Sequence, residues 1–212
     1  MKIEVWSDFV CPFCYVGKRI LENALEKFEH SDDVEVTFKS YELDPTSVSD
    51  ESVHFEEELA KKKNMSLDNI KEMNESIILR AKEVGLDYNF DNMKQTNTLD
   101  AHRLMKYAET QGKGDAYTER VLKAHFEESE FIGSQETLVR LASEVDIDES
   151  DSRDVLESGK YLDEVRADQA EATQLRVQGV PFFVINRKYA VSGAQPEELF
   201  LQTLEKVWAE EN

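Results

Sequence analysis

The pattern that most constrains the fold is β-prone sequence at both ends of the chain, with a long helical stretch between them. At the N-terminal end, apolar residues alternate in residues 2–6 and again in residues 35–39, which predicts two strands. Between these segments, residues 12–28 carry an apolar stripe at three- and four-residue steps, which predicts a helix. This strand–helix–strand order is typical of a βαβ unit with two parallel strands in one sheet.

The β pattern returns near the C-terminal end. Residues 180–185 are apolar throughout, as a buried central strand would be. Residues 189–192 predict a second strand, which a polar turn joins to the first as a hairpin. A helix is predicted from Pro196 to about Trp208. From about residue 53 to residue 179 we find helical patterns and no convincing strand.

Strand-forming ends that pair in one sheet leave the middle of the chain as an insertion. We therefore expect an α/β fold in which one domain, made of residues 1–48 and 175–212, is interrupted by an all-helical domain of residues 49–174. Within the insertion, Ser66 and Ser134 are predicted to cap the N-termini of two helices.

The strongest functional signal is the pair of cysteines in Cys11-Pro12-Phe13-Cys14, at the start of the first predicted helix. Residues i and i+3 lie on one helical face, which matches the separation of roughly 5.5 Å between Cα atoms that a disulfide requires. The unpaired N–H groups and partial positive charge of a helix N-terminus favour a thiolate at Cys11. Cys14 falls on the apolar stripe and is expected to be partly buried. These positions predict that Cys11 exchanges with a partner's disulfide and that Cys14 resolves the mixed disulfide.

Two other interpretations of the cysteine pair are a zinc site and a pair without chemistry. A Cys-x-x-Cys zinc site requires two further ligands, and the sequence has no third cysteine. The four histidines show no ligand-like spacing; they are His30, His54, His102 and His125. We therefore expect redox chemistry with no metal and no organic cofactor.

Charge and hydropathy argue against some classes of binding partner and indicate where in the cell the protein is located. The 212 residues include 25 Lys and Arg against 45 Asp and Glu, a net charge of −20, which argues against nucleic acid and anionic membranes as partners. No segment approaches the roughly 18 consecutive apolar residues of a membrane span, and residues 1–10 lack the apolar core of a signal peptide. We expect a cytoplasmic address, where thiols are mostly reduced, so the two cysteines require a role other than a structural disulfide.

Val180-Pro181 opens the predicted central strand, where a proline cannot donate a hydrogen bond to the sheet. The proline is explained if the Val180–Pro181 bond is cis and packs against the cysteine pair, because the Val180 backbone would then be offered to an extended substrate. The alternative is an ordinary trans proline at the first residue of a strand. Cis bonds make up only about 5–6% of X–Pro bonds, so the dipeptide alone does not decide between them.

Five segments, spread in order over almost the whole chain, carry a family resemblance. They are residues 6–17 (WSDFVCPFCYVG), 41–45 (YELDP), 97–103 (NTLDAHR), 179–181 (GVP) and 192–195 (SGAQ). Together they resemble the DsbA-type branch of the thioredoxin superfamily, in particular its FrnE-like group of cytoplasmic oxidoreductases. The resemblance implies a thioredoxin fold with an inserted helical domain, and a cis Val180–Pro181 bond beside the dithiol.

The same resemblance adds possible substrate contacts. It places the start of an inserted helix against the active-site cleft, where Asn97, His102 and Arg103 would touch a substrate. The alternative is that Asn97 caps this helix and that His102 is a satisfied interface histidine, and we favour it because a single histidine at a helix start is common. Gln195, just before the last helix, would meet the polar end of a ligand or act as a cap.

One departure from the family pattern concerns the redox potential. The periplasmic DsbA proteins resemble Cys-Pro-His-Cys, whereas this chain has Phe13 between its cysteines. A histidine there can stabilise the thiolate electrostatically, and a phenylalanine cannot. Asp8 would oppose the thiolate if it lies close in space. We therefore expect a pair less oxidising than that of DsbA, whose potential is about −120 mV.

The resemblance implies a cytoplasmic thiol–disulfide oxidoreductase or isomerase that acts on protein or small-molecule thiols and disulfides. The sequence does not decide between a monomer and a homodimer. A second interpretation is a transferase or isomerase that depends on glutathione or another low-molecular-weight thiol. The kappa-class glutathione transferases and 2-hydroxychromene-2-carboxylate isomerases are similar in fold, but carry a serine at the position of Cys11. A third interpretation is a non-catalytic polypeptide-binding or chaperone module in which the thiols are incidental.

Overall fold

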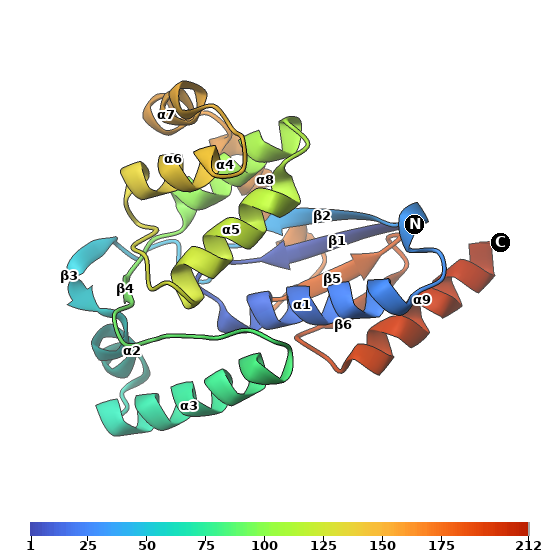
Figure 1. Cartoon of the computed structure of the whole chain (residues 1–212), viewed down its shortest axis with the longest axis horizontal. Helices are drawn as coiled ribbons and strands as arrows, with labels where there is room; N and C mark the ends of the chain where they lie inside the picture. The colour runs from blue at the N-terminus through green and yellow to red at the C-terminus, as the bar shows by residue number, and fades with distance from the viewer. Residues whose placement is uncertain (212) are drawn as a thin grey trace.

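Strands from the two ends of the chain pair in one sheet, as the sequence predicts. The computed structural model describes residues 1–211, so position 212, the last residue of the predicted discontinuous domain, lies outside the described residues. The strands of this sheet are β1 (Lys2–Ser7), β2 (Glu35–Ser40), β5 (Phe182–Ile185) and β6 (Tyr189–Ser192). Their order is β2-β1-β5-β6 (Figure 1). β1 runs parallel to β2 and antiparallel to β5, and β5 and β6 form the predicted hairpin.

One face of this sheet packs against two helices that lie side by side in Figure 1. They are α1 (Pro12–Lys27) and α9 (Glu197–Glu211). Because successive side chains of a strand point to opposite faces, Ile3 and Val5 share this face with their partners Ile185 and Phe183, and all four are at most 2% exposed. Phe183 meets Phe200 of α9 edge to face, with ring centroids 4.8 Å apart. This layer fixes the start of α1, and both cysteines with it, close to the end of β1.

The opposite face of the sheet packs against α8 (Leu162–Gln174), a helix of the inserted segment. Trp6 and Val184 of the sheet form a small apolar cluster there with Ala172 and Val177. The Trp6 indole is fully buried, and its Nε1 donates a hydrogen bond of 2.9 Å to the backbone carbonyl of Asp168. The insertion therefore covers the sheet rather than standing apart from it.

A buried cluster of charges ties α8 and α4 (Leu99–Thr110) to the edge strand β2. The Asp168 carboxylate, in a residue that is 5% exposed, lies 2.7 Å from Lys106 Nζ and 3.1 Å from Lys39 Nζ. It also accepts the backbone N–H of Ser40 at 2.9 Å. A buried charge is tolerated only when partners replace its hydration, so these contacts specify how the inserted helices sit on the sheet.

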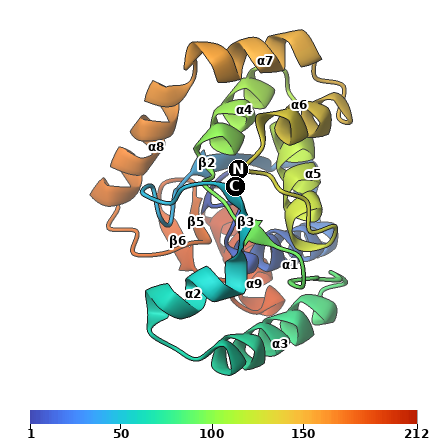
Figure 2. The same cartoon turned by 90° about the vertical axis from the view of Figure 1, so that its left-hand side faces the viewer.

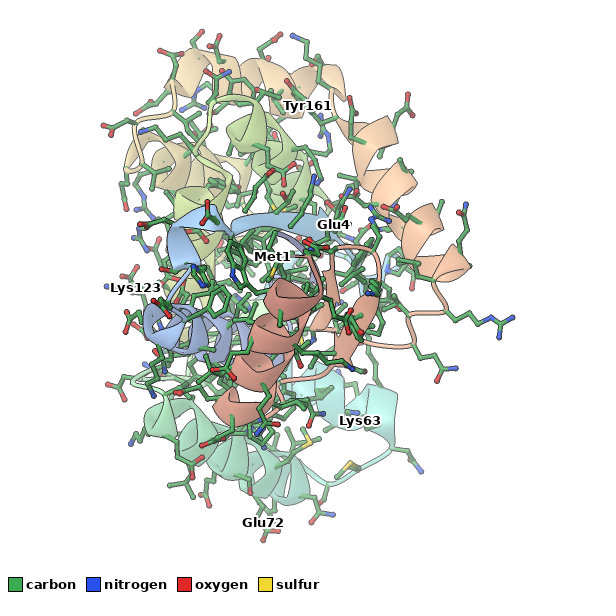
Figure 3. All side chains as sticks on the ribbon, turned by 90° about the vertical axis from the view of Figure 1, so that its right-hand side faces the viewer. Met1, Glu4, Lys63, Glu72, Lys123 and Tyr161 are labelled. Carbon is green, nitrogen blue, oxygen red and sulfur yellow. The ribbon has the colours of Figure 1, made fainter. Side chains whose placement is uncertain are left out.

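The inserted helices form two groups on opposite sides of the molecule (Figure 2). One group is α2 (Phe55–Lys63) and α3 (Leu67–Glu83), and the other runs from α4 to α8. In Figure 3 the first group carries the labels Lys63 and Glu72 at the bottom, and the second carries Tyr161 at the top. The remaining helices are α5 (Gly114–Phe126), α6 (Gln135–Ser143), α7 (Glu149–Ser158) and the short 3-10 helix η1 (Ser31–Asp33).

The predicted helix caps are confirmed. Ser66 Oγ accepts the backbone N–H of Asn69 at 3.2 Å at the start of α3, and Ser134 Oγ accepts that of Thr137 at 3.4 Å at the start of α6. Across residues 1–211, the structure contains no helix with the length and hydropathy that crossing a membrane requires.

The expectation that residues 53–179 contain no strand is wrong. β3 (Asp50–His54) pairs antiparallel with β4 (Lys94–Gln95) in a small second sheet, with an irregular register. Neither strand has alternating apolar residues, and β4 has two residues, so hydrophobic periodicity carries no signal for them. Contacts between distant segments hold the pair in place, among them the Phe55 N–H bonded to the Met93 carbonyl at 3.0 Å.

Candidate active site

The two cysteines occupy the first turn of α1 and have different surroundings. Cys11 is the N-cap residue, and its side chain makes no capping hydrogen bond, so its sulfur is left for other contacts. Pro12 follows at the first helical position, where its missing N–H costs nothing. The Cys14 N–H donates to the Cys11 carbonyl at 3.0 Å, and both thiols are free. Cys14 is 2% exposed, so it is more deeply buried than the sequence indicates.

The Val180–Pro181 bond is cis and lies beside the dithiol. The Cys11 Sγ–H donates to the Val180 carbonyl oxygen at 3.4 Å. α1 approaches Pro181 closely because Gly17 has no side chain: a Cβ at position 17 would lie 2.8 Å from Pro181 Cγ and 3.2 Å from Phe183 Cζ. The glycine three residues after Cys14 therefore lets the helix bring Cys11 against the Val180–Pro181 segment.

Cys14 is held as a protonated thiol behind Cys11. Burial raises its pKa well above the usual value, and the hydrogen bond and charge of Cys11 raise it further. The Asp8 backbone N–H donates to Cys14 Sγ at 3.4 Å, which opposes this rise only in part. The pair is thus asymmetric: Cys11 faces a cleft, and Cys14 faces the interior.

Asp8 and His102 form a buried pair next to the dithiol, and each is 1% exposed. Asp8 Oδ1 lies 3.3 Å from His102 Nε2, and Asp8 Oδ2 accepts the backbone N–H of Leu43 at 2.8 Å. The sequence indicated that Asp8 would oppose a thiolate if it lay close in space, and the structure places it there. His102 contacts Asp8 and the ring of Phe9, whose centroid is 4.9 Å away.

Sequence reasoning missed Tyr88. Its hydroxyl donates to the Pro12 carbonyl at 2.7 Å, inside the Cys-x-x-Cys turn. Its ring lies roughly parallel to those of Tyr15 and Phe126, with centroids 6.0 Å and 4.8 Å away, and burial raises the pKa of its hydroxyl. Alternation of apolar residues in Leu86-Asp-Tyr88-Asn-Phe90 was the available signal that Tyr88 points inward.

A cleft of about 390 Å³ opens in front of Cys11. Cys11, Pro12 and Phe13 line it from the start of α1, and Leu43 lines it from the loop after β2. Its opposite wall comes from the inserted segment and is mainly apolar; that wall includes Phe55, Leu59, Met73, Ile77 and Phe90. The cleft therefore offers a hydrophobic surface to a substrate group whose sulfur is bonded to the Cys11 sulfur.

The rim of the cleft carries lysines, although the chain as a whole has a net charge of −20. Lys62 is paired with Asp44 at 2.7 Å, and this hydrogen bond lowers the pKa of Asp44 to about 2. Lys63 and Lys94 also line the cleft, and neither has an ion-pair partner within residues 1–211. Asp8, Asp44 and Glu58 line the same cleft, so its charges balance, and Lys63 and Lys94 are the two cations of the lining that are left to bind a negatively charged group.

The structure places the other candidate residues in intramolecular contacts away from the lining of this cleft. Asn97 Oδ1 accepts the Leu99 N–H at 3.0 Å at the start of α4, and its Nδ2 donates to the Ser47 carbonyl at 3.0 Å. Gln195 Nε2 donates to the Ser192 carbonyl at 2.8 Å.

Arg103 is 5% exposed and donates to backbone carbonyls at the end of α7 and just beyond it. These carbonyls belong to Val155, Leu156 and Lys160. Because carbonyls at a helix C-terminus lack helical partners, Arg103 fixes α7 against α4. In the described part of the chain, no group of three or more His, Cys, Asp and Glu side chains is arranged to hold a metal ion.

Comparisons with known proteins agree with this geometry. A family model described as DSBA-like thioredoxin domain matches residues 2–205. A probable DsbA oxidoreductase from Streptomyces coelicolor is 39% identical, with a TM-score of 0.92 over 99% of this chain and 91% of that chain. YwbO, an uncharacterized protein of Bacillus subtilis, is 32% identical over 93% of this chain and 92% of its own length. The cytosolic disulfide reductase DsbM from Pseudomonas aeruginosa, also solved with GSH, has a TM-score of 0.71 at 15% identity over 99% of both chains.

Proposed function

The chain belongs to the DSBA-like thioredoxin domain family, and we propose that it is a cytoplasmic thiol–disulfide oxidoreductase or isomerase that uses Cys11 and Cys14. The observation that carries this proposal is the asymmetry of the dithiol: Cys11 lines the cleft beside the Val180 carbonyl, and Cys14 is buried behind it. The cytosolic DsbM neighbour supports the cytoplasmic address. We take residues 1–48 with 175–212 as the domain that carries the dithiol, and residues 49–174 as the inserted domain.

The reaction divides into two exchanges. The Cys11 thiolate attacks one sulfur of a substrate disulfide; a Cys11–substrate disulfide forms, and the other substrate sulfur leaves as a thiolate that takes up a proton. Cys14 then loses its proton and attacks the Cys11 sulfur, which releases the second substrate thiolate. In total the protein dithiol is oxidised to a disulfide by two electrons, and the substrate disulfide is reduced to two thiols. The reverse sequence oxidises a substrate dithiol.

Titration against glutathione redox buffers tests this function. As the buffer becomes more oxidising, we expect Cys11 and Cys14 to lose their free thiols together because they form one internal disulfide. The midpoint potential of this dithiol–disulfide pair is expected to lie below about −120 mV. The reason is that Phe13 supplies no positive charge to the Cys11 thiolate and that Asp8, an acidic residue, lines the same cleft as Cys11. Free thiols are counted by alkylation and mass spectrometry at each buffer ratio.

The Cys14→Ser variant is the control for this titration, because it cannot close an internal disulfide. A potential at or above about −120 mV would contradict the electrostatic argument while leaving the dithiol function intact. A wild-type chain that collects glutathione on Cys11 without closing to the internal disulfide would contradict the proposed function itself.

The lysines at the cleft rim favour a second candidate: exchange with an anionic low-molecular-weight thiol or its disulfide. The DsbM neighbour was solved with GSH, a thiol of this class. Lys63 and Lys94 would attract its carboxylates, and the apolar wall would contact its carbon skeleton.

Replacing both lysines tests this candidate. Lys63→Gln with Lys94→Gln is expected to slow the reduction of glutathione disulfide about tenfold and to leave the reduction of uncharged hydroxyethyl disulfide unchanged, since each weakened ionic contact is worth up to about 1 kcal/mol. Stopped-flow rates with both substrates provide the measurement. The control is Lys82→Gln with Lys123→Gln, which makes the same change in net charge at two exposed positions that do not line the cleft. Equal slowing of both substrates would exclude a role in charge selection.

A further inference from the structure

Tyr88 reaches the turn between the two cysteines from the inserted segment, and the exchange chemistry leaves it without a role. The residue is 5% exposed, and its hydroxyl donates a hydrogen bond to the Pro12 carbonyl at 2.7 Å. Pro12 lies between Cys11 and Cys14, 76 positions from Tyr88 in the sequence. Because a buried hydroxyl without an acceptor costs stability, this phenol and this carbonyl are held together.

The residues of the turn itself provide few anchors for its middle. Pro12 has no N–H group to donate, and Phe13 is 38% exposed. The local bond of the turn joins its two ends, from the Cys14 N–H to the Cys11 carbonyl at 3.0 Å. The Tyr88 hydroxyl therefore holds the part of the turn that this local bond does not reach.

The Tyr88 ring is held in a cluster of aromatic side chains. It lies roughly parallel to the rings of Phe126 and Tyr15, with centroids 4.8 Å and 6.0 Å away. The next residue, Asn89, donates its backbone N–H to the Phe126 carbonyl at 2.7 Å, which attaches this segment to the end of α5. Because ring packing and this backbone bond limit the movement of the phenol, its hydroxyl is a fixed point for the Pro12 carbonyl.

The reduced turn already brings the two sulfurs together. Burial raises the pKa of the Cys14 thiol, and its hydrogen bond with the Cys11 side chain raises it further, so the sulfurs are in contact before they bond. Tyr88 lies close to both of them: burial raises the pKa of its hydroxyl, and Tyr15, Cys11 and Cys14 raise it further. The phenol therefore keeps its proton and remains a hydrogen-bond donor while the sulfurs react.

We propose that Tyr88 is a positioning residue for the second exchange: its hydrogen bond to Pro12 holds the turn in the shape in which the resolving thiol attacks. This inference rests on the proposed function. In that step the Cys14 thiolate bonds to the Cys11 sulfur, and the Cys11–substrate disulfide breaks. The substrate sulfur leaves with both electrons of that bond and takes up a proton, which balances the proton that Cys14 has lost. Tyr88 exchanges neither protons nor electrons; it speeds ring closure because groups held in the reacting geometry react faster.

Two tyrosine-to-phenylalanine variants test this role. Tyr88→Phe removes the hydroxyl that is bonded to Pro12 and keeps the ring. Tyr15→Phe is the matched control, because it removes a hydroxyl from the same aromatic cluster whose partner is Glu119, at 2.7 Å, and not the turn. Wild type and both variants are mixed with glutathione disulfide in single-turnover stopped flow, and release of the first and the second glutathione is followed.

Tyr88→Phe is expected to slow the second release about fivefold, the effect of one hydrogen bond, and to leave the first release unchanged. The equilibrium constant for the internal disulfide, measured in glutathione redox buffers, is expected to fall by the same factor, which raises the midpoint potential by about 20 mV. Tyr15→Phe is expected to match the wild type in both measurements. Urea denaturation establishes that each variant is folded under the assay conditions.

A hydrogen bond that only stabilises the fold would give a different result. It would lower the unfolding free energy of Tyr88→Phe and leave both releases unchanged, because both occur in the folded chain. An unchanged second release in Tyr88→Phe, an equal slowing of its two releases, or an equal slowing of the second release in Tyr15→Phe overturns the positioning role. A wild-type chain that never releases the second glutathione contradicts the proposed function instead.

Discussion

Cys11→Ser is expected to abolish disulfide exchange, and Cys14→Ser is expected to stop it halfway. Cys11 is the thiol that lines the cleft, so without it no mixed disulfide forms. Cys14 is 2% exposed and held as a thiol, so it cannot replace Cys11 as the attacking group. In Cys14→Ser the first exchange proceeds, and the substrate remains bonded to Cys11. Mass spectrometry of each variant after incubation with glutathione disulfide gives the readout: no adduct for Cys11→Ser and one adduct per chain for Cys14→Ser.

The two cysteine variants are matched controls for each other, because each removes one sulfur from the same helical turn. Retention of the chain's activities in Cys11→Ser would favour the interpretation as a polypeptide-binding module with incidental thiols. An adduct on Cys14 in the Cys11→Ser variant would reverse the assigned roles.

Asp168→Ala is expected to lower the free energy of unfolding by about 1.5–3 kcal/mol, because it removes the carboxylate shared by the buried Lys106 and the half-buried Lys39. The loss stays below that of a wholly unpaired buried charge, since Lys106 keeps Glu109 at 3.0 Å and Lys39 keeps Glu171 at 3.6 Å. It also removes the acceptor of the Ser40 N–H in the edge strand. Urea denaturation at pH 7 gives the unfolding free energy. Asp163→Ala is the matched control, since Asp163 is exposed on the same helix, and we expect a change within about 0.5 kcal/mol.

Asp168→Ala also tests how the inserted helices are attached to the sheet. The dithiol does not contact Asp168, so the fraction of the variant that remains folded should exchange disulfides at the wild-type rate. A loss of less than about 1 kcal/mol would mean that the lysines regain water and that the apolar contact of Trp6 with α8 is sufficient. A variant that is stable but inactive would instead connect the charge cluster to the site.

Sequence analysis predicted the features that depend on residues close together in the chain and missed those that depend on contacts between distant residues. The strands at both ends, the caps at Ser66 and Ser134 and the helix that begins after Cys11 are local patterns, and the structure confirms them. The β3–β4 pair is different: its segments lie about 40 residues apart and have no apolar alternation, so pattern analysis returned only helices for this region. Local alternation indicates that Tyr88 points inward, but not that its hydroxyl meets Pro12, which is 76 residues away in the sequence.

His102 illustrates the limit most clearly. Its position at the start of an inserted helix marked it as a candidate for substrate contact, with a buried interface histidine as the alternative. The residue that it contacts, Asp8, is 94 positions away, and this pairing depends on how α4 docks on the end of β1. Arg103, next to it in the sequence, points instead to the end of α7. Adjacent residues on a helix face different neighbours, so one motif was divided between two environments.

The sequence by itself determined the order of strands and helices at the two ends of the chain and singled out the Cys11–Cys14 pair, but it missed the β3–β4 pair. Both predictions depend on short-range patterns. The spacing of apolar residues predicts strands and helices, and two cysteines three residues apart lie on one face of a helix that begins with proline. The tertiary structure alone decided what surrounds the two sulfurs. The Val180 carbonyl at Cys11 comes from 169 residues away, and the cleft wall comes from the inserted helices. Burial and partners are properties of the packed chain: they place Cys11 against the cleft and the Val180 carbonyl, and they raise the pKa of the more deeply buried Cys14.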